Sequence, residues 1–189
     1  VEMSVRLALS ERLATEENAP KDLIEVLANA EIEVAYPILR ESSVLQDIDL
    51  IEIIQHRTMK HQLAVAMRDS LSESVSDALV ETGNNDVIKS LLDNEGAEIS
   101  ARTLEYLVDQ SKTVDTYQNP LLHRKDLSSD LARRMYWWVS AALREHIVDA
   151  FNLSSEDLEE FLEDTVDDLV SEEATGNGRN KSAALAGQL

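Results

Sequence analysis

Histidines, carboxylates and hydroxyls are the side chains of this sequence that could do chemistry, but their spacing assembles no reaction centre. The four histidines, His56, His61, His123 and His146, include no pair at the spacing that places two metal ligands on one helical face. We therefore expect them to have surface or capping roles. The chain has no Cys, which excludes thiol catalysis and cysteine-ligated zinc or iron–sulfur sites.

Acids and serines occur throughout the chain without a spacing that singles out a catalytic pair. No glycine-rich loop could cradle a phosphate, and the acidic runs lack the alternation and the central Gly of a calcium loop. Most Asp and Glu side chains fit the solvated faces of helices. The sequence predicts no catalytic residue, no metal site and no cofactor, and hence a protein that is not an enzyme.

Candidate partner-binding residues lie in one stretch where bases and aromatic rings gather. They are Arg124, Lys125, Arg133, Arg134 and Trp137. Tyr136, Trp137 and Trp138 are consecutive, so on one helix they span about 200° and cannot all face the core. Trp138 is in phase with neighbouring apolar residues and is expected in the core. Trp137 either packs beneath a neighbouring repeat or the acidic helix, or is an exposed anchor for a partner.

The elements that must position these residues are helices, about ten of them, because apolar residues recur at three- and four-residue steps. The longest is expected from Ser129 to about Phe151. An acidic helix over residues 155–173 follows, with an apolar stripe that closes the end of the array or pairs with a second copy. The domains expected are a helical repeat domain over 1–152, the acidic helix within 153–174 and a flexible tail over 175–189.

A repeat with a period of about 27 residues organises the chain, within the range that is typical of repeat proteins. The run Pro37-Ile38-Leu39-Arg40 has weaker echoes that begin at Val65, Ser90 and Pro120. The segments DLIEVL (22–27) and DLIEII (49–54) are nearly identical and lie one period apart. Such a period indicates a solenoid, in which each helix pair buries its apolar face against the next pair.

The sequence also resembles a known family. The residues that carry the resemblance include Val75–Gly83 and, most specifically, the run LARRMYWWVS at 131–140. Over roughly residues 7–150 the chain is similar to an alphaproteobacterial domain of unknown function whose repeats resemble HEAT and leucine-rich-variant units. The resemblance implies an all-α right-handed superhelix in a cytoplasmic bacterial protein, and it brings no known catalytic residues.

Charge narrows the possible partners. The formal net charge is −20, and residues 145–175 contain 12 acids without Lys or Arg. Such a chain repels nucleic-acid phosphates and anionic lipid, and no run has the ~18 apolar residues of a membrane helix. We expect a scaffold in bacterial signalling or regulation that binds a protein or peptide, as a monomer or as a homodimer through the acidic helix. The alternative is a HEAT-like protein that binds or repairs nucleic acid, which would need a continuous basic groove.

Overall fold

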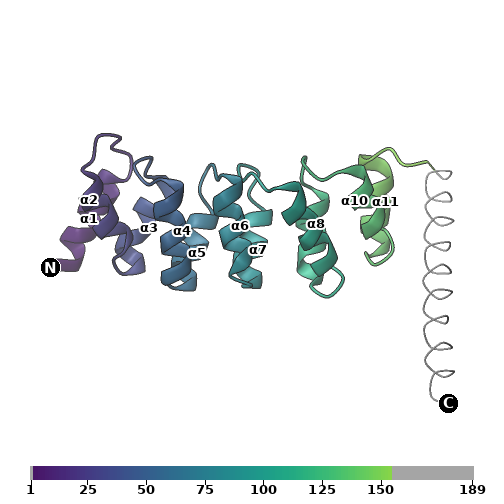
Figure 1. Cartoon of the computed structure of the whole chain (residues 1–189), viewed down its shortest axis with the longest axis horizontal. Coiled ribbons are helices and arrows are strands. Elements are labelled where there is room, and N and C mark those ends of the chain that lie inside the picture. The colour runs from purple at the N-terminus through teal and green to yellow at the C-terminus, as the bar shows by residue number, and fades with distance from the viewer. Residues whose placement is uncertain (1, 155–189) are drawn as a thin grey trace, which may run out of the picture. The chain divides into compact units, whose positions relative to one another are not determined.

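The computed structural model describes residues 2–154, which fold into helices joined by short turns (Figure 1). The helices are α1 (Glu2–Leu13), α2 (Lys21–Ala28), α3 (Ile32–Glu41), α4 (Asp47–His56), α5 (Met59–Ala66), α6 (Glu73–Glu81), α7 (Asn85–Leu92), α8 (Ala101–Gln110), the 3-10 helix η1 (Asp115–Tyr117), α9 (Gln118–Leu122), α10 (Ser129–Met135) and α11 (Ala141–Ala150). Within the described residues the only β-pairing is an isolated bridge between Leu71 and Ala97. The predicted all-α class is confirmed.

The chain divides into two compact units, one ending at Leu131 and the other beginning at Ala132. The first holds α1 to α9 and the start of α10, and the second holds the end of α10 and α11. The repeat domain expected over 1–152 therefore includes residues of both units. The acidic helix expected over 155–173 and the tail expected over 175–189 lie outside the described residues. No helix of the described part combines the length and apolar character needed to cross a membrane.

The first unit is a stack of helix pairs in two layers. Helices α1, α3, α5, α7 and α9 contact one another in that order and form one layer, which we call the odd layer. In the other layer α4 contacts α6, and each of α2, α4 and α6 packs against the odd helix that follows it. Each helix of these two layers thus buries its apolar side against its neighbours.

The core follows the repeated segments closely. Ile24 and Leu27 of α2 are buried, and so are Leu50, Ile53 and Ile54 of α4. The helical pattern of apolar residues predicts that Ile48 also faces inward, but this prediction is wrong, because the Ile48 side chain is 71% exposed. Ile48 lies in the first turn of α4, on the side opposite the arc that packs against α5 and α6.

Polar residues and a glycine mark the ends of α6 and the start of α7. Ser72 caps α6 by accepting a hydrogen bond from the backbone of Val75, and Asn84 caps α7 in the same way. Gly83, which follows α6, has a φ of 65°, a conformation that glycine adopts without steric cost.

The long helix expected from Ser129 to Phe151 is two helices. Residues 136–140 form a turn, and α11 starts afresh after Ser140, whose hydroxyl accepts from the backbone N–H of Leu143 across 3.4 Å. The apolar residues on both sides keep a helical phase, so hydropathy alone does not reveal the break. The capping hydroxyl of Ser140 stabilises the new helix start.

Candidate protein-binding surface

Among the histidines of the described residues, His61 has a structural role. It is buried and hence not a surface residue, and its two ring nitrogens lie 2.9 Å from Oγ1 of Thr58, the N-cap of α5, and 3.0 Å from the carbonyl of Ala30. These bonds join the α2–α3 turn to the start of α5. Among residues 2–154 no group of three His, Asp or Glu side chains could hold a metal ion.

Arg124, expected to contact a partner, instead holds two repeats together. Its guanidinium donates to the carbonyls of Asn94 (3.1 Å) and Ala97 (2.8 Å) and pairs with Asp126 across 2.6 Å. The side chain is only 7% exposed. A buried guanidinium whose donors serve backbone carbonyls has little capacity left for a partner. The neighbouring Lys125 is 89% exposed and pairs with Glu95.

The remaining predicted residues belong to the second unit. Arg133 and Arg134 lie in the last turn of α10 and are half-buried, while Trp137 lies in the α10–α11 turn and is 39% exposed. Trp138, expected in the core, is only half-buried, because residues 136–138 form a turn and not a helix.

The exposed ring of Trp137 is held by its neighbours. It stacks edge-on against Tyr136, with ring centroids 5.5 Å apart, and Arg144 lies over the Tyr136 ring at 5.4 Å. The five predicted residues are thus split between the two units, with Arg124 and Lys125 in the first and the others in the second.

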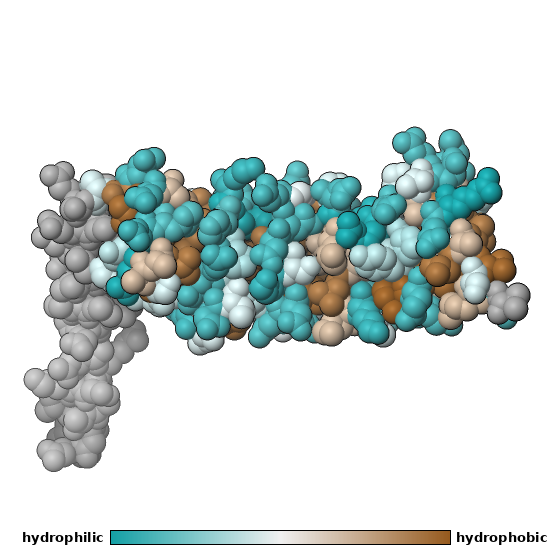
Figure 2. Space-filling model, turned by 180° about the vertical axis from the view of Figure 1, so that it is seen from behind, coloured by the Kyte–Doolittle hydropathy of each residue, from teal (hydrophilic) through white to brown (hydrophobic). Residues whose placement is uncertain are grey.

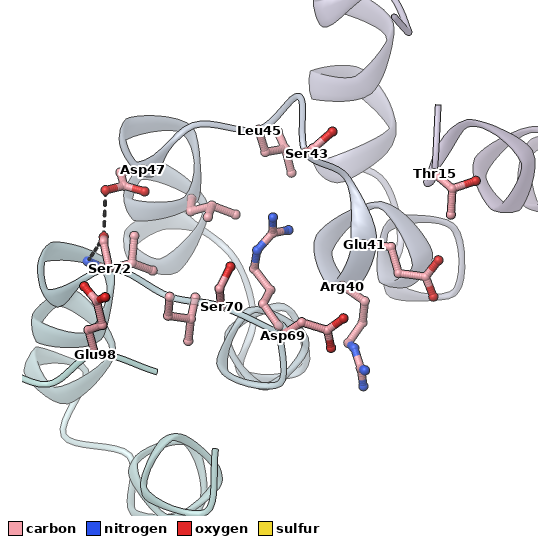
Figure 3. A pocket seen from close by; sticks show the side chains of 14 residues that line it. Thr15, Arg40, Glu41, Ser43, Leu45, Asp47, Asp69, Ser70, Ser72 and Glu98 are labelled. Atoms are coloured by element: carbon pink, nitrogen blue, oxygen red, sulfur yellow. Dashed lines mark hydrogen bonds between the residues drawn. The ribbon is translucent and has the colours of Figure 1, made fainter. Parts of the chain in front are cut away.

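A cavity of about 740 Å³ lies where the loops of the first three helix pairs converge (Figure 3). Its bases are Arg40 and Arg68, and its acids are Glu41, Asp47, Asp69 and Glu98. Three of its polar side chains, those of Arg68, Asp47 and Ser72, already form hydrogen bonds between helix pairs. Arg68 donates to the carbonyls of Leu39 (2.6 Å) and Ser42 (2.8 Å), and Asp47 accepts from Ser72 (2.6 Å).

Burial lowers the pKa of Arg68, although the charges of Asp69 and Asp47 oppose that shift. Arginine nevertheless stays protonated in proteins, so this group cannot act as a base. The cavity therefore offers structural hydrogen bonds and an excess of negative charge.

The surface that stands out is the outer side of α3 and α5, which we call the α3–α5 face. The buried residues Val34, Ile38 and Leu39 of α3 match His61, Val65 and Ala66 of α5, each one repeat later in the chain. The same offset pairs the outward-facing residues: Ile32 with Met59, Glu33 with Lys60, Tyr36 with Leu63 and Arg40 with Met67.

Large apolar side chains on the α3–α5 face remain in contact with solvent. Tyr36 is 42% exposed and Met59 and Met67 are each 43% exposed, while Leu63 between the two methionines is half-buried. Met59, Leu63 and Met67 form a continuous stripe on α5 at i, i+4 and i+8. Scattered exposed apolar residues are ordinary, but a contiguous set on adjacent helices is typical of an interaction site.

The apolar character ends at α7. When α5 and α7 are aligned by their buried residues, Lys89 and Asp93 of α7 take the positions that Leu63 and Met67 have on α5. Lys89 and Asp93 form an exposed ion pair at 2.6 Å. Figure 2 shows a mostly hydrophilic surface from behind, with hydrophobic atoms gathered most densely toward the N-terminal helices, on the right in that view.

Sequence reasoning did not find the α3–α5 face. The sequence does contain one signal of this face, the offset of 27 residues between equivalent positions of α3 and α5. This offset places the apolar residues Tyr36 and Leu63 at the same position of the two helices. Hydropathy assigns such residues to the core, and only the packing shows which apolar residues of each helix are left over.

The comparisons with known proteins place the chain in a family. Residues 34–189 match the family described as "uncharacterised protein conserved in bacteria (DUF2336)", so the chain belongs to that bacterial family. The match starts within α3, after Ile32 and Glu33, and includes the rest of the α3–α5 face and the α10–α11 turn. No curated protein and no solved structure matches the chain.

Proposed function

We propose that this chain is a non-catalytic scaffold of HEAT-like helical repeats that binds a protein or peptide partner through the α3–α5 face. The observation that carries the proposal is the exposed set of Tyr36, Met59 and Met67 on two adjacent helices, bounded by the charged α7. Methionine side chains are flexible and polarizable, and they adapt to the apolar side of a partner helix.

The rest of the proposal is supported by the resemblance that the sequence shows. The stacked pairs form a right-handed superhelix of the kind that the resemblance implies, in an alphaproteobacterial protein of the cytoplasm. Its role lies in signalling or regulation. The absence of a catalytic constellation among the described residues favours binding over catalysis.

Nucleic-acid binding is the weaker alternative because the chain has a net charge of −20 and two clefts of the first unit have more acids than bases. The cavity between the first three helix pairs has four acids against two bases. A second cleft, of about 440 Å³, combines Arg124 and Lys125 with Asp93, Glu95, Glu98 and Asp126. A DNA-binding groove needs bases that neutralise phosphates along its length.

The proposal is tested by using this chain as the bait for affinity capture from a bacterium that contains a protein of this family, followed by mass spectrometry. The double variant Tyr36→Asp/Met67→Asp should lose the captured proteins. Tyr106→Asp is the matched control, because Tyr106 is 52% exposed on α8, away from the α3–α5 face. Capture that is equal for all three proteins would contradict a docking role of this face, and captured nucleic acid would revive the alternative.

A further inference from the structure

The outer side of α3 has opposite charges at its two ends and an apolar middle. Glu33 lies in its first turn, Tyr36 and Pro37 occupy the centre, and Arg40 lies in its last turn. Such a stripe is complementary to an antiparallel copy of itself, because the acid at one end meets the base at the other. Self-complementarity of one patch is what a two-fold symmetric interface requires.

We propose that the α3–α5 face binds the same face of a second copy of this chain, which forms a two-fold symmetric dimer. The inference rests on the proposed protein-binding function and names the partner at that surface. A two-fold axis between positions 36 and 37 pairs Glu33 of each copy with Arg40 of the other. It also places Tyr36 of each copy against Pro37 of the other.

The same axis gives a compatible arrangement on α5. Helices α3 and α5 are neighbours in the odd layer and run in the same direction, since Arg68 beyond the end of α5 bonds the last carbonyls of α3. Helix α5 therefore also lies antiparallel against its own copy. Met59 then meets Met67 of the other copy, and Leu63 meets Leu63, so the apolar stripe is covered along its length.

The charges of α3 have no competing partner in the described part of the chain. Neither Glu33 nor Arg40 has an ion-pair partner within 4.0 Å among residues 2–154. The Nε atom of Arg40 is buried without a hydrogen-bond partner there. Figure 3 shows the Arg40 guanidinium pointing out of the cavity and not toward its centre.

Helix α7 limits the extent of the interface. Under the same symmetry Lys89 would approach Lys89 of the other copy, and these like charges oppose extension of the contact beyond α5. A small interface with an apolar centre and two ion pairs is typical of a weak, concentration-dependent dimer.

The test uses the purified full chain in sedimentation velocity from micromolar to millimolar concentration. Glu33→Arg and Arg40→Glu should each weaken dimerisation about tenfold or more, because each places two pairs of like charges across the axis. The double variant Glu33→Arg/Arg40→Glu should recover the dimer, since the ion pairs reform with reversed polarity. Glu52→Arg is the matched control, because Glu52 is an exposed acid on α4 in the other layer.

Each other outcome overturns the inference. A chain that stays monomeric at all concentrations excludes the dimer, and a dimer that is insensitive to both single variants uses another surface, such as residues 155–173. If both single variants weaken the dimer and the double variant does not restore it, the antiparallel register is wrong. Circular dichroism of each variant separates a lost contact from a lost fold.

The dimer and the proposed function fail separately. If the purified chain is monomeric but Tyr36→Asp/Met67→Asp abolishes capture of another protein, the function stands and the dimer does not. If the chain dimerises as expected and capture is unaffected by that variant, the face serves self-association only.

Discussion

Arg124 donates a hydrogen bond to the backbone carbonyl of Asn94 across 3.1 Å, and the side chain of Asn94 donates to the carbonyl of Arg68 across 2.7 Å. Arg68 in turn donates to the carbonyls of Leu39 and Ser42. Each of the three residues lies just beyond the end of an odd helix and binds carbonyls at the end of the preceding odd helix. The last carbonyls of a helix have no partner within that helix. Here those of α3, α5 and α7 accept hydrogen bonds from a residue that follows the next odd helix.

These hydrogen bonds of Arg68, Asn94 and Arg124, which we call the carbonyl network, predict that Arg124→Lys destabilises the first unit. The planar guanidinium donates to two backbone carbonyls and to the Asp126 carboxylate at the same time. The single ammonium group of a lysine cannot bind all three in this geometry. Leaving buried carbonyls unpaired should lower the free energy of unfolding by about 1–3 kcal/mol. Urea unfolding measures the loss. Lys112→Arg is the control, since Lys112 is exposed and its substitution should leave stability nearly unchanged.

Asn94→Ala should produce a similar loss, because it removes the bonds to Ala66 and Arg68 and the bond that Asn94 Oδ1 accepts from Gly96. Combined with Arg124→Lys, the loss should be smaller than the sum of the two single losses, since the residues share one network. If the losses of free energy of unfolding are strictly additive in the double-mutant cycle, the carbonyl network acts as separate contacts.

Two glycines should respond differently to alanine. A Cβ on Gly96 would collide with the backbone carbonyl oxygen of Asp69, beside the bridge that joins Leu71 to Ala97. A Cβ on Gly83 meets no atom, and only its φ of 65° is unfavourable. Gly83→Ala should therefore cost about 1–2 kcal/mol, and Gly96→Ala should cost clearly more. Thermal unfolding of the two variants compares the costs, and the opposite order would contradict the predicted collision.

Tyr117 should make the free energy of unfolding depend on pH in the alkaline range. Burial raises the pKa of its phenol above 10.0, helped by the nearby Tyr106 and the charge of Asp86, and its hydroxyl donates to Asn85 Oδ1 across 2.8 Å. The unfolded chain loses the proton at lower pH than the folded chain does. The stabilisation is complete below pH 10.0 and is lost as the pH rises toward the folded pKa.

Thermal midpoints measured from neutral to strongly alkaline pH should therefore fall more steeply for the wild type than for Tyr117→Phe. The variant itself should be less stable at neutral pH by about 1 kcal/mol, because Asn85 loses its donor. Tyr36→Phe is the control for an exposed phenol, because Tyr36 is 42% exposed and is not one of the groups that shift the pKa of Tyr117. Parallel curves for the wild type and Tyr117→Phe would show that Tyr117 titrates as an exposed tyrosine does.

Trp137 tests the surface of the second unit that the sequence singles out. Because its side chain is 39% exposed in a turn, Trp137→Ala should change the free energy of unfolding by less than about 1 kcal/mol. If the turn anchors a partner, the same variant should reduce affinity capture while Tyr106→Ala does not. Unchanged capture would show that Trp137 does not anchor a partner.

The sequence by itself determined the helical class, the period and several helix boundaries. Ser72 and Gly83 are recognisable because capping and left-handed backbone depend on the residue and its immediate neighbours. The near-identity of 22–27 and 49–54 likewise places equivalent helices in successive repeats. The sequence also separated the acidic segment after residue 144 from the rest of the chain.

Only the tertiary structure decided how individual side chains are used. Ile48 looks like a core residue and Arg124 looks like a surface cation, yet Ile48 is exposed and Arg124 is buried against backbone carbonyls that follow α7. The physical reason is that a residue's neighbours in a repeat stack come from the repeats before and after it in the chain. Local patterns report the phase of one helix, and the contacts between helices determine which parts of its surface remain exposed.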